Sequence, residues 1–552
     1  MSNLLDKASI ILTPTAYDNG KALCVKPSDG SGDFDFSRNS AATRVNAQGL
    51  VENVQSLSSN LITNGSFDTD SDWNLNGWNI SGGSANNDGI NTGNINQDIG
   101  LQQNKFYKIS ISITNYVSGA LKVRLGTGNQ IDVGSSNGEY ILYLENTTTN
   151  PNIRFYPDAT LNFQGSIDNV SVREVIDNTN LPRINYEGFS YDGSGNVVPD
   201  SGCGSWLFEP QSTNLITYSE DFSNASWTKV EASVTSGFSS PDGLTNAYKL
   251  IASVNNSNHR IRSAIIPTAA VGTTVTFSIY IKPQEITKIA LVDNWTNLSY
   301  GVVNLTTNSV IEEAQGTTSV TEILNGFRRV SFTYQTANIN TLPAVYLLDD
   351  GYTSGNPTSY TFASDGTSGV YIWGAQTEQQ SYATSYIPTS GSSVTRNQDV
   401  CNNGGSLASI NSTEGTLYFE GAALADDLTN RTITLSDGTT TNFVLIRFND
   451  GGSNRIYTRV NVGGAVQYFD LEFSIDITNT NKIAIRYGDN NFATFINGSK
   501  VNSQLSGSVF GAGVLTELAF DNGAGNQNLF GKTKAVAVWK EALSDSELQS
   551  LT

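Results

Sequence analysis

The stretch Asn60-Leu61-Ile62-Thr63, with Trp73 downstream, decides the fold because it occurs a second time. The second copy is Asn214-Leu215-Ile216-Thr217 with Trp227, and in both copies the tryptophan follows the asparagine by 13 residues. A spacing repeated in this way indicates that one domain was duplicated within the chain. The two copies are therefore expected to share one strand order and to bury their tryptophans at equivalent positions.

The sequence around both copies has the period of β-strands. Residues 107–113 and 121–125 in the first copy and 274–281 in the second are built of β-branched and aromatic residues, and in the first copy they alternate apolar with polar residues. Alternation with a period of two is typical of a strand with one buried face. Gly- and Asn-rich turns separate these strands, so the chain is expected to be all-β, with tandem β-sandwiches.

The length of 552 residues suits several domains, because single hydrophobic cores stop growing at roughly 250–300 residues. Residues 1–56 hold too little apolar area for a core of their own and are expected to pack on a neighbouring domain or on another subunit. Residues 57–176 form the first predicted sandwich and 213–400 the second, with a connector at 177–212. Residues 401–552 form the third.

Composition excludes several classes of partner. A net charge of -20 repels phosphate backbones and anionic lipid, so no nucleic acid is expected. No run of about 18 apolar residues is present, and the start of the chain lacks a secretory signal, so neither membrane insertion nor export is expected. The three cysteines are far apart in sequence, which indicates neither a disulfide framework nor a zinc site.

Several blocks carry a family resemblance. Residues 57–176, which open with Asn60 to Asp68 and close with Ile167-Asp168-Asn169-Val170-Ser171-Val172, resemble carbohydrate-binding modules of the galactose-binding-like jelly-roll type. Residues 213–400 look like a second, divergent copy. The end of the chain, at 537–545, is similar to concanavalin A-like (laminin G-like) domains. The resemblance implies two jelly rolls followed by a concanavalin A-like sandwich.

Two further phrases resemble proteins of bacteriophage tails and virion appendages. They are residues 40–44 and, more specifically, Tyr382-Ala383-Thr384-Ser385-Tyr386-Ile387-Pro388-Thr389. The resemblance implies a virion protein that is assembled in the host cytoplasm. Residues 1–56 would then contact other virion proteins, and a homo-oligomer is expected.

The resemblance also implies a structural Ca²⁺ ion in the first module. Asp68 and Asp168 match the family's positions between the first and last strands, and Asp70 and Asp72 add two oxygen ligands nearby. A solvated acidic turn is the alternative. No equivalent site is expected in the second module, where Trp373 stands in the place of Asp168.

Sugar binding requires exposed aromatic rings beside polar side chains, because sugar C–H faces stack on rings while hydroxyl groups need directional partners. The alternative for any such ring is a place in the sandwich core. The candidates lie in or beside turn-rich segments and are Trp78, Tyr116, Tyr156, Trp295 and Tyr300.

Catalysis has little support in the sequence. His259 is the only histidine, and no serine or cysteine lies in a recognisable nucleophile motif. We therefore expect a non-enzymatic structural protein of a bacteriophage particle, in a tail or capsid appendage or fibre, that contributes to host-surface glycan adhesion. Two alternatives stay open: a purely architectural or capsid-decoration protein without sugar binding, and a polysaccharide depolymerase that uses paired carboxylates.

Overall fold

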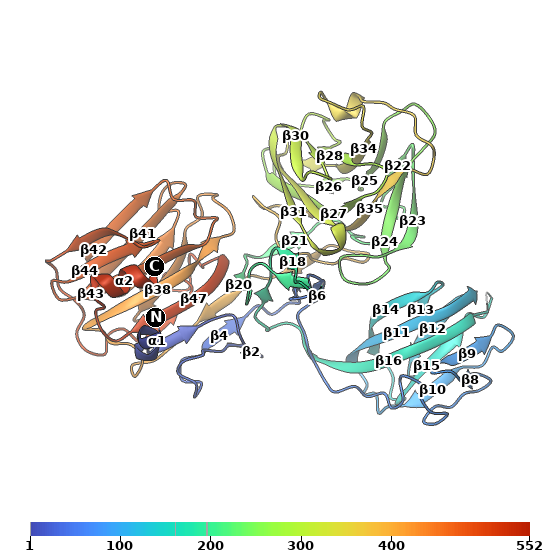
Figure 1. Cartoon of the computed structure of the whole chain (residues 1–552), viewed down its shortest axis with the longest axis horizontal. Coiled ribbons are helices and arrows are strands. Elements are labelled where there is room, and N and C mark those ends of the chain that lie inside the picture. Colours follow the sequence, from blue (N-terminus) through green and yellow to red (C-terminus); the bar gives the residue numbers. More distant parts are fainter. Residues whose placement is uncertain (1, 161, 195–196) are drawn as a thin grey trace.

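Three β-sandwiches surround a central junction in the computed structural model, which describes residues 2–160, 162–194 and 197–552 (Figure 1). The all-β prediction is therefore confirmed. Each sandwich has its own hydrophobic core. Short strand pairs form the junction between them.

The first sandwich packs a four-stranded sheet against a six-stranded one, and neighbouring strands are antiparallel. The smaller sheet has the order β10 (Ile95–Asp98), β15 (Asn152–Pro157), β12 (Leu121–Leu125), β13 (Ile131–Gly134). The larger has the order β14 (Gly138–Asn146), β11 (Lys105–Ser118), β16 (Gln164–Asp177), β9 (Ala85–Asp88), β8 (Asn79–Ile80), and β7 (Ser56–Leu57) also pairs with β16.

The second sandwich consists of two six-stranded sheets. One has the order β22 (Thr228–Val230), β25 (His259–Arg262), β34 (Pro343–Leu348), β28 (Lys288–Asp293), β29 (Tyr300–Asn304), β30 (Ser309–Ala314). The other has the order β23 (Ala232–Phe238), β24 (Ala247–Ala252), β35 (Gly369–Glu378), β27 (Thr274–Pro283), β32 (Arg328–Gln335), β31 (Gly316–Glu322).

These strand orders correspond, as the repeat predicts. The order β10-β15-β12-β13 matches β25-β34-β28-β29, and β14-β11-β16-β9-β8 matches β32-β27-β35-β24-β23. The second sandwich adds β22, β30 and β31. Trp73 and Trp227 are 8% and 2% exposed. Each indole N–H donates to the carbonyl nine residues earlier, in Asn64 at 2.9 Å and in Tyr218 at 2.8 Å. The predicted shared strand order and the equivalent burial of the two tryptophans are confirmed.

A shared β-bulge supports the same alignment. In the first sandwich two residues, Asn169 and its neighbour, lie opposite one residue of β11, and in the second Gly374 and its neighbour lie opposite one residue of β27. Asn169 and Gly374 have φ angles of 51° and 60°. Asparagine and glycine both tolerate this left-handed conformation, so both copies can form the same bulge although their sequences differ.

The asparagine that opens each repeat joins the first strand region to the last strand. The side-chain oxygen of Asn60 accepts the N–H groups of Ile62 (3.2 Å) and Val172 (3.0 Å). That of Asn214 accepts those of Ile216 and Thr377, both at 3.1 Å. Asn214 is fully buried, whereas Asn60 is exposed.

We expect Asn214→Ala to lower the free energy of unfolding of the second sandwich by about 2–3 kcal/mol, because buried N–H groups lose their acceptor. Asn60→Ala is the matched control. It should cost the first sandwich less than about 1 kcal/mol, since water can reach the same donors there. Urea unfolding followed by hydrogen exchange of each sandwich measures both, and equal losses would contradict the expectation.

The third sandwich recruits strands from outside residues 401–552. Its five-stranded sheet has the order β42 (Ala465–Phe473), β41 (Arg455–Val462), β40 (Phe443–Phe448), β39 (Arg431–Ser436), β46 (Glu517–Ala519). The larger sheet has the order β17 (Ile184–Asn185), β20 (Ser205–Phe208), β47 (Gly531–Trp539), β38 (Glu414–Ala423), β43 (Asn481–Gly488), β44 (Phe492–Ile496), β45 (Ser499–Gln504), and β1 (Ile10–Leu12) also pairs with β47.

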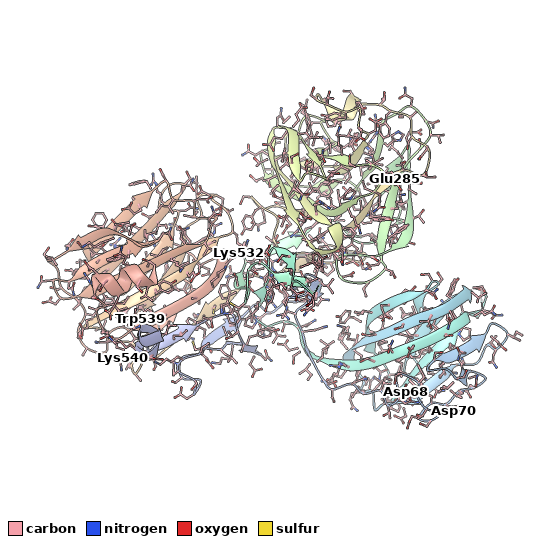
Figure 2. All side chains as sticks on the ribbon, viewed as in Figure 1. Asp68, Asp70, Glu285, Lys532, Trp539 and Lys540 are labelled. Atoms are coloured by element: carbon pink, nitrogen blue, oxygen red, sulfur yellow. The ribbon has the colours of Figure 1, made fainter. Side chains whose placement is uncertain are left out.

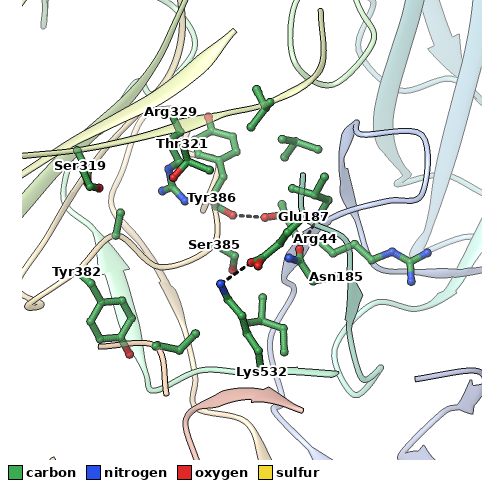
Figure 3. Close-up of a pocket in the computed structure, with 18 of the residues that line it drawn as sticks. Arg44, Asn185, Glu187, Ser319, Thr321, Arg329, Tyr382, Ser385, Tyr386 and Lys532 are labelled. Carbon is green, nitrogen blue, oxygen red and sulfur yellow. Dashed lines mark hydrogen bonds and ion pairs between the residues drawn. The ribbon is translucent and has the colours of Figure 1, made fainter. Parts of the chain in front are cut away.

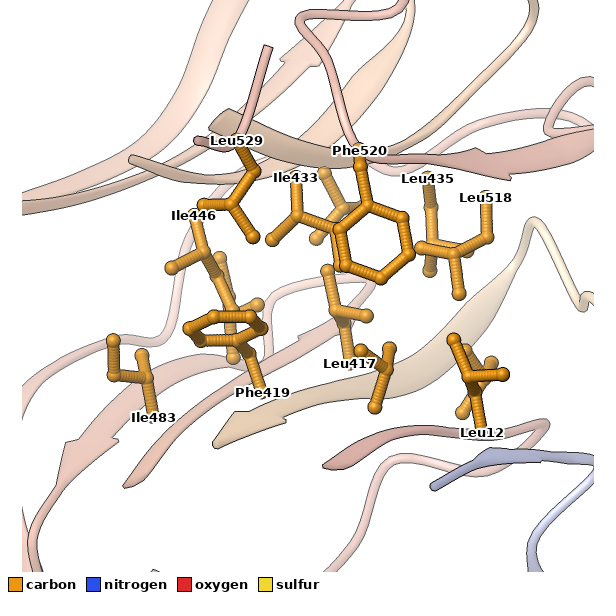
Figure 4. Packing of buried hydrophobic residues seen from close by; sticks show 14 of the residues in the cluster. Leu12, Leu417, Phe419, Ile433, Leu435, Ile446, Ile483, Leu518, Phe520 and Leu529 are labelled. Carbon is orange, nitrogen blue, oxygen red and sulfur yellow. The ribbon is translucent and has the colours of Figure 1, made fainter. Parts of the chain in front are cut away.

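The core of this sandwich shows why the predicted start at 401 is too late. Leu12 from the N-terminal segment packs beside Leu417 and Phe419 (Figure 4), and Trp206 from the predicted connector is fully buried in the same cluster. Apolar residues of segment 1–56 are thus buried in the core of the third sandwich of the same chain. Of the two expected packing partners, the neighbouring domain is the one observed.

Short strand pairs complete the junction. They are β5 (Thr43–Val45) with β6 (Val51–Asn53), β21 (Ser212–Asn214) with β36 (Val394–Arg396), β18 (Phe189–Tyr191) with β19 (Val197–Pro199), and the sheet β2 (Tyr17–Asp18), β3 (Lys21–Ala22), β4 (Phe34–Ser37), β37 (Val400–Asn402). A further short pair, β26 (Ile266–Pro267) with β33 (Asn340–Thr341), belongs to the second sandwich. Two of the junction pairings, β21 with β36 and β4 with β37, join segments more than 150 residues apart.

Helices are few and short: α1 (Ser2–Lys7), α2 (Asp545–Leu551) and the 3₁₀ turns Leu324–Gly326 and Pro357–Ser359. Across the described residues none of them is long and apolar enough to cross a membrane. Ser544 and Glu547 form a capping box at the start of α2. The three cysteines are unpaired; Cys24 and Cys401 are buried and Cys203 is exposed.

Candidate functional site

A buried network of charges holds the junction together. Arg38 and Arg183 both donate to the carboxylate of Asp399, and Arg183 and Arg396 both donate to Glu209. All five side chains are at most 3% exposed. They come from the N-terminal segment, the predicted connector and the linker after the second sandwich. Removing one partner would leave a buried charge without its counter-charge, so this network holds the N-terminal segment, the predicted connector and the linker together.

Segment 382–389, the second of the two segments that resemble virion proteins, lies within this junction. Ser385 Oγ accepts a hydrogen bond from Arg396 at 2.8 Å and donates one to Glu209 at 2.7 Å. The ring of Tyr386 packs on Trp373 with centroids 4.7 Å apart, and its backbone carbonyl accepts the hydroxyl of Thr43 at 2.5 Å. The phrase therefore joins the second sandwich to the N-terminal segment.

A cavity of about 620 Å³ with a mixed polar and apolar lining opens beside this junction (Figure 3). One wall carries the hydroxyl groups of Thr317, Ser319 and Thr321 from β31, and Lys532 of the third sandwich pairs with Glu187 across it at 2.6 Å. None of the aromatic residues that the sequence predicts as ligand platforms lines this cavity. It is a gap between sandwiches that an ion pair bridges.

One junction carboxyl group is expected to make stability depend on pH. Tyr386 donates to Glu220 at 2.9 Å, and the amide of Asn246 bridges Glu220 and Asp242. Burial, and then the like charge of Asp242, raises the pKa of Glu220 from 4.5 to about 7. Because the folded pKa is the higher one, the stabilisation is complete below pH 4.5 and is lost as the pH rises through 7.

We expect the second sandwich to be roughly 2–3 kcal/mol less stable at about pH 8 than at about pH 5 on account of this group. Glu220→Gln keeps the shape but cannot ionise, so it should flatten the profile. Urea unfolding across this pH range measures the effect. The expectation fails if wild type and variant have parallel profiles.

The predicted calcium ligands do not come together. The described residues contain no group of three or more acidic, histidine or cysteine side chains that could hold a metal. Asp68 accepts the hydroxyl of Ser66 at 2.6 Å, and Asp168 accepts the N–H of Asn169 at 2.6 Å. Asp70 and Asp72 are exposed, and Figure 2 shows Asp68 and Asp70 at the outer rim of the first sandwich. The described residues therefore support the alternative of a solvated acidic turn, in which Asp68 and Asp72 accept hydrogen bonds from neighbouring serines.

Four of the five predicted sugar platforms have structural roles. Trp78 is 4% exposed, packs on Phe163 and donates to the carbonyl of Gly93 at 3.0 Å. Tyr300 is 8% exposed, and its hydroxyl donates to Glu312 at 3.1 Å. Tyr116 and Tyr156 are half-buried; the first bonds to Gly119 and the second lies under the guanidinium of Arg124. A ring with these contacts has no exposed face on which a sugar could stack.

Trp295 is the exception, with 38% of its surface exposed. It lies in the turn between β28 and β29, beside a hollow of about 390 Å³ at the end of the β25-β34-β28 sheet. Asp293, which is buried, shapes this turn: its carboxylate accepts the N–H groups of Trp295 at 3.2 Å and Leu342 at 3.0 Å.

Two planar polar groups line the same hollow. Arg262 makes no side-chain hydrogen bond or ion pair with any residue that the structure describes, although the chain as a whole is acidic. The Asn294 amide donates to the hydroxyl of Tyr346 at 2.9 Å, and its oxygen is buried without a protein partner. An exposed indole face and a guanidinium without a partner among the described residues match the chemistry of a sugar ring and its hydroxyl groups, while the buried oxygen of Asn294 lies behind them.

His259, the only histidine of the sequence, is fully buried in β25. Its ring nitrogens contact the backbone oxygens of Glu231 at 2.6 Å and Phe362 at 2.8 Å. Both nitrogens are therefore occupied by structural contacts. His259 has no exposed nitrogen with which to act as a general base.

Comparisons with known proteins give no family for this chain. No protein-family model and no curated protein matches it. Solved structures with some likeness include the CBM40 module of a Ruminococcus gnavus sialidase bound to α2,3-sialyllactose, at 16% identity over 26% of this chain and 83% of that one, with a TM-score of 0.23. Another is domains LG4-5 of the mouse laminin α1 chain, at 10% identity over 52% and 89%, with a TM-score of 0.19.

A third is a Trypanosoma rangeli sialidase in complex with sialic acid, at 10% identity over 93% of this chain and 96% of that one, with a TM-score of 0.21. Identities and scores this low assign neither a family nor a function. The function has to be argued from the residues of the chain itself.

Proposed function

We propose that this chain is a non-enzymatic structural protein of a bacteriophage particle, in a tail or capsid appendage, and that it contributes to adhesion to host-surface glycans. The observation that carries the adhesive role is the Trp295 hollow, where an exposed ring lies beside Arg262 and Asn294. Single sites of this kind bind weakly. An array of copies on a particle would make them useful through avidity.

Two observations support the placement in a virion. Segments 40–44 and 382–389 resemble virion proteins, and segment 382–389 lies in the buried junction. A chain that projects from a particle needs fixed joints, and the buried charges around Ser385 supply one. Contact with other virion proteins and homo-oligomerisation belong to the same proposal. The apolar residues of segment 1–56 that fill the third sandwich are not available for such contacts.

Trp295→Ala should weaken binding of the full chain to surface polysaccharide purified from its host by up to about tenfold, because an aromatic stacking contact contributes about 0.5–1.5 kcal/mol. Phe106→Ala is the matched control, since Phe106 is an exposed aromatic residue, 52% accessible, on the first sandwich. Binding to a glycan array or to the polysaccharide itself measures this.

The same experiment separates the alternatives. If the wild-type chain does not bind any host polysaccharide, the purely architectural or decoration role is favoured. Release of reducing ends from the polysaccharide by the wild-type chain would instead support a depolymerase. Labelling of purified particles with an antibody to the chain tests the virion placement separately.

A further inference from the structure

The outer face of the five-stranded sheet in the third sandwich carries an unusual set of side chains. Val444, Ile446 and Tyr468 point into the core. Because side chains alternate along strands, their neighbours on β40, β41 and β42 face outward. Figure 1 shows β41 and β42 on the side of this sandwich that is turned away from the other two. The outward set is Arg447, Arg455, Tyr457, Arg459, Phe469 and Phe473, and we call it the Arg-aromatic face.

The strand register places arginines and aromatic rings side by side. Arg455 lies opposite Phe473, and Arg459 lies opposite Phe469. The guanidinium of Arg455 is 5.1 Å from the ring centroid of Phe473, and that of Arg447 is 5.9 Å from the ring of Tyr457. Cation–π contacts of this kind hold the guanidinium groups over the rings and leave part of their N–H donors for other partners.

Two large rings of this face are open to solvent. Phe469 is 58% and Phe473 57% exposed. Arg447 pairs with Asp450 at 2.7 Å, whereas Arg455 and Arg459 pair with no carboxylate among the described residues. These two donate instead to the backbone oxygen of Asp450 and to the side chain of Asn461. The face is therefore positive and aromatic on a chain whose net charge is -20.

We propose that the Arg-aromatic face binds an acidic polysaccharide, one whose sugars carry carboxylate groups. The guanidinium groups of Arg455 and Arg459 would bind the carboxylates, and Phe469 and Phe473 would stack on the sugar rings between them. The two arginines are four residues apart on one strand, about 13 Å along it, so an extended polymer fits this open face better than a small molecule. The proposal rests on the glycan-binding role proposed above but uses a different sandwich and a different site.

The test is native gel electrophoresis of the full chain in gels that contain alginate, a carboxylated polysaccharide, or neutral dextran. Alginate should retard the wild-type chain at low salt and less at high salt, because exposed charges are screened. The double variant Arg455→Gln/Arg459→Gln should bind alginate about tenfold more weakly, the sum of two partly exposed ionic contacts. Arg173→Gln, at an exposed arginine of the first sandwich, is the matched control and should change nothing.

Phe469→Ser/Phe473→Ser tests the rings without changing charge and should also weaken retardation. All variants should keep the wild-type melting temperature, because the altered side chains are at least partly exposed. The inference is overturned if alginate does not retard the wild-type chain, or if it retards the double arginine variant equally. Binding to poly-L-glutamate but not to alginate would overturn it in favour of an acidic protein partner.

Trp295→Ala keeps this test distinct from that of the proposed function. It should leave alginate retardation unchanged while it weakens binding of the host polysaccharide to the hollow. If retardation depends on Trp295 and not on the arginines, the inference fails while the proposed glycan binding stands.

Discussion

Asp399→Ala is expected to destabilise the junction by about 3–5 kcal/mol, because it leaves buried arginines without a counter-charge. The Asp399 carboxylate is 0% exposed and accepts hydrogen bonds from Arg38, Arg183 and the backbone N–H of Glu209. Water cannot reach these donors once the carboxylate is gone. Urea unfolding gives the loss of free energy, and small-angle X-ray scattering should show a larger radius of gyration as the sandwiches lose their fixed arrangement.

Asp132→Ala is the control for this prediction. Asp132 pairs with Lys122 at 2.8 Å, but its side chain is 76% exposed, so its loss should cost less than about 1 kcal/mol. If the two variants lose similar amounts, or if scattering is unchanged in Asp399→Ala, the buried charges do not hold the junction.

Trp206→Ala is expected to cost the third sandwich about 3–5 kcal/mol, the usual effect of removing a buried aromatic side chain. Trp206 is fully buried, and its strand β20 pairs with β47 although it precedes residue 401 by almost 200 positions. Hydrogen exchange should rise in peptides from β47 and β38 and stay unchanged in the second sandwich.

Trp295→Ala is the matched control here, since Trp295 is partly exposed and the change should alter stability by no more than about 0.5 kcal/mol. If Trp206→Ala leaves exchange in β47 unchanged, the predicted connector is no part of the third sandwich, and a domain that begins at 401 would stand.

The sequence predicts the repeated sandwiches well because the signals are local. The spacing of Asn60 and Trp73, repeated at Asn214 and Trp227, fixes the same turn and the same bond to the last strand in each copy. The Asn497-Gly498 hairpin is a further local signal: both residues have positive φ, at 49° and 81°, as a type I′ turn requires.

The junction could not be predicted because its partners are distant in sequence. Arg38 and Asp399 are about 360 residues apart, and nothing near either residue indicates the other. The same applies to β1 and β20, which complete a sheet formed mostly by the last 140 residues. A single sequence does not show whether an arginine is buried or exposed. Segments 40–44 and 382–389 could therefore be recognised by resemblance, but their role in the junction could not be predicted.

The candidate site was predicted in part. Trp295 was named together with Trp78, Tyr116, Tyr156 and Tyr300, because composition cannot show which ring faces solvent. The partners of Trp295 were missed. Arg262 ends strand β25, 33 residues before Trp295, and nothing in the sequence indicates that Arg262 or Asn294 lines the same hollow as Trp295. The calcium prediction failed for a related reason, since matching aspartates by sequence says nothing of where their carboxylates point.

The fluorescence of Trp295 offers the most direct test of glycan binding. Of the seven tryptophans, all within the described residues, the other six are at most 8% exposed. Quenching by acrylamide should therefore act on Trp295 and be almost absent in Trp295→Ala. Addition of polysaccharide purified from the host surface is predicted to protect the emission of the wild-type chain from the quencher in a saturable way. Quenching that stays the same at every polysaccharide concentration would contradict the claim that this hollow binds a glycan.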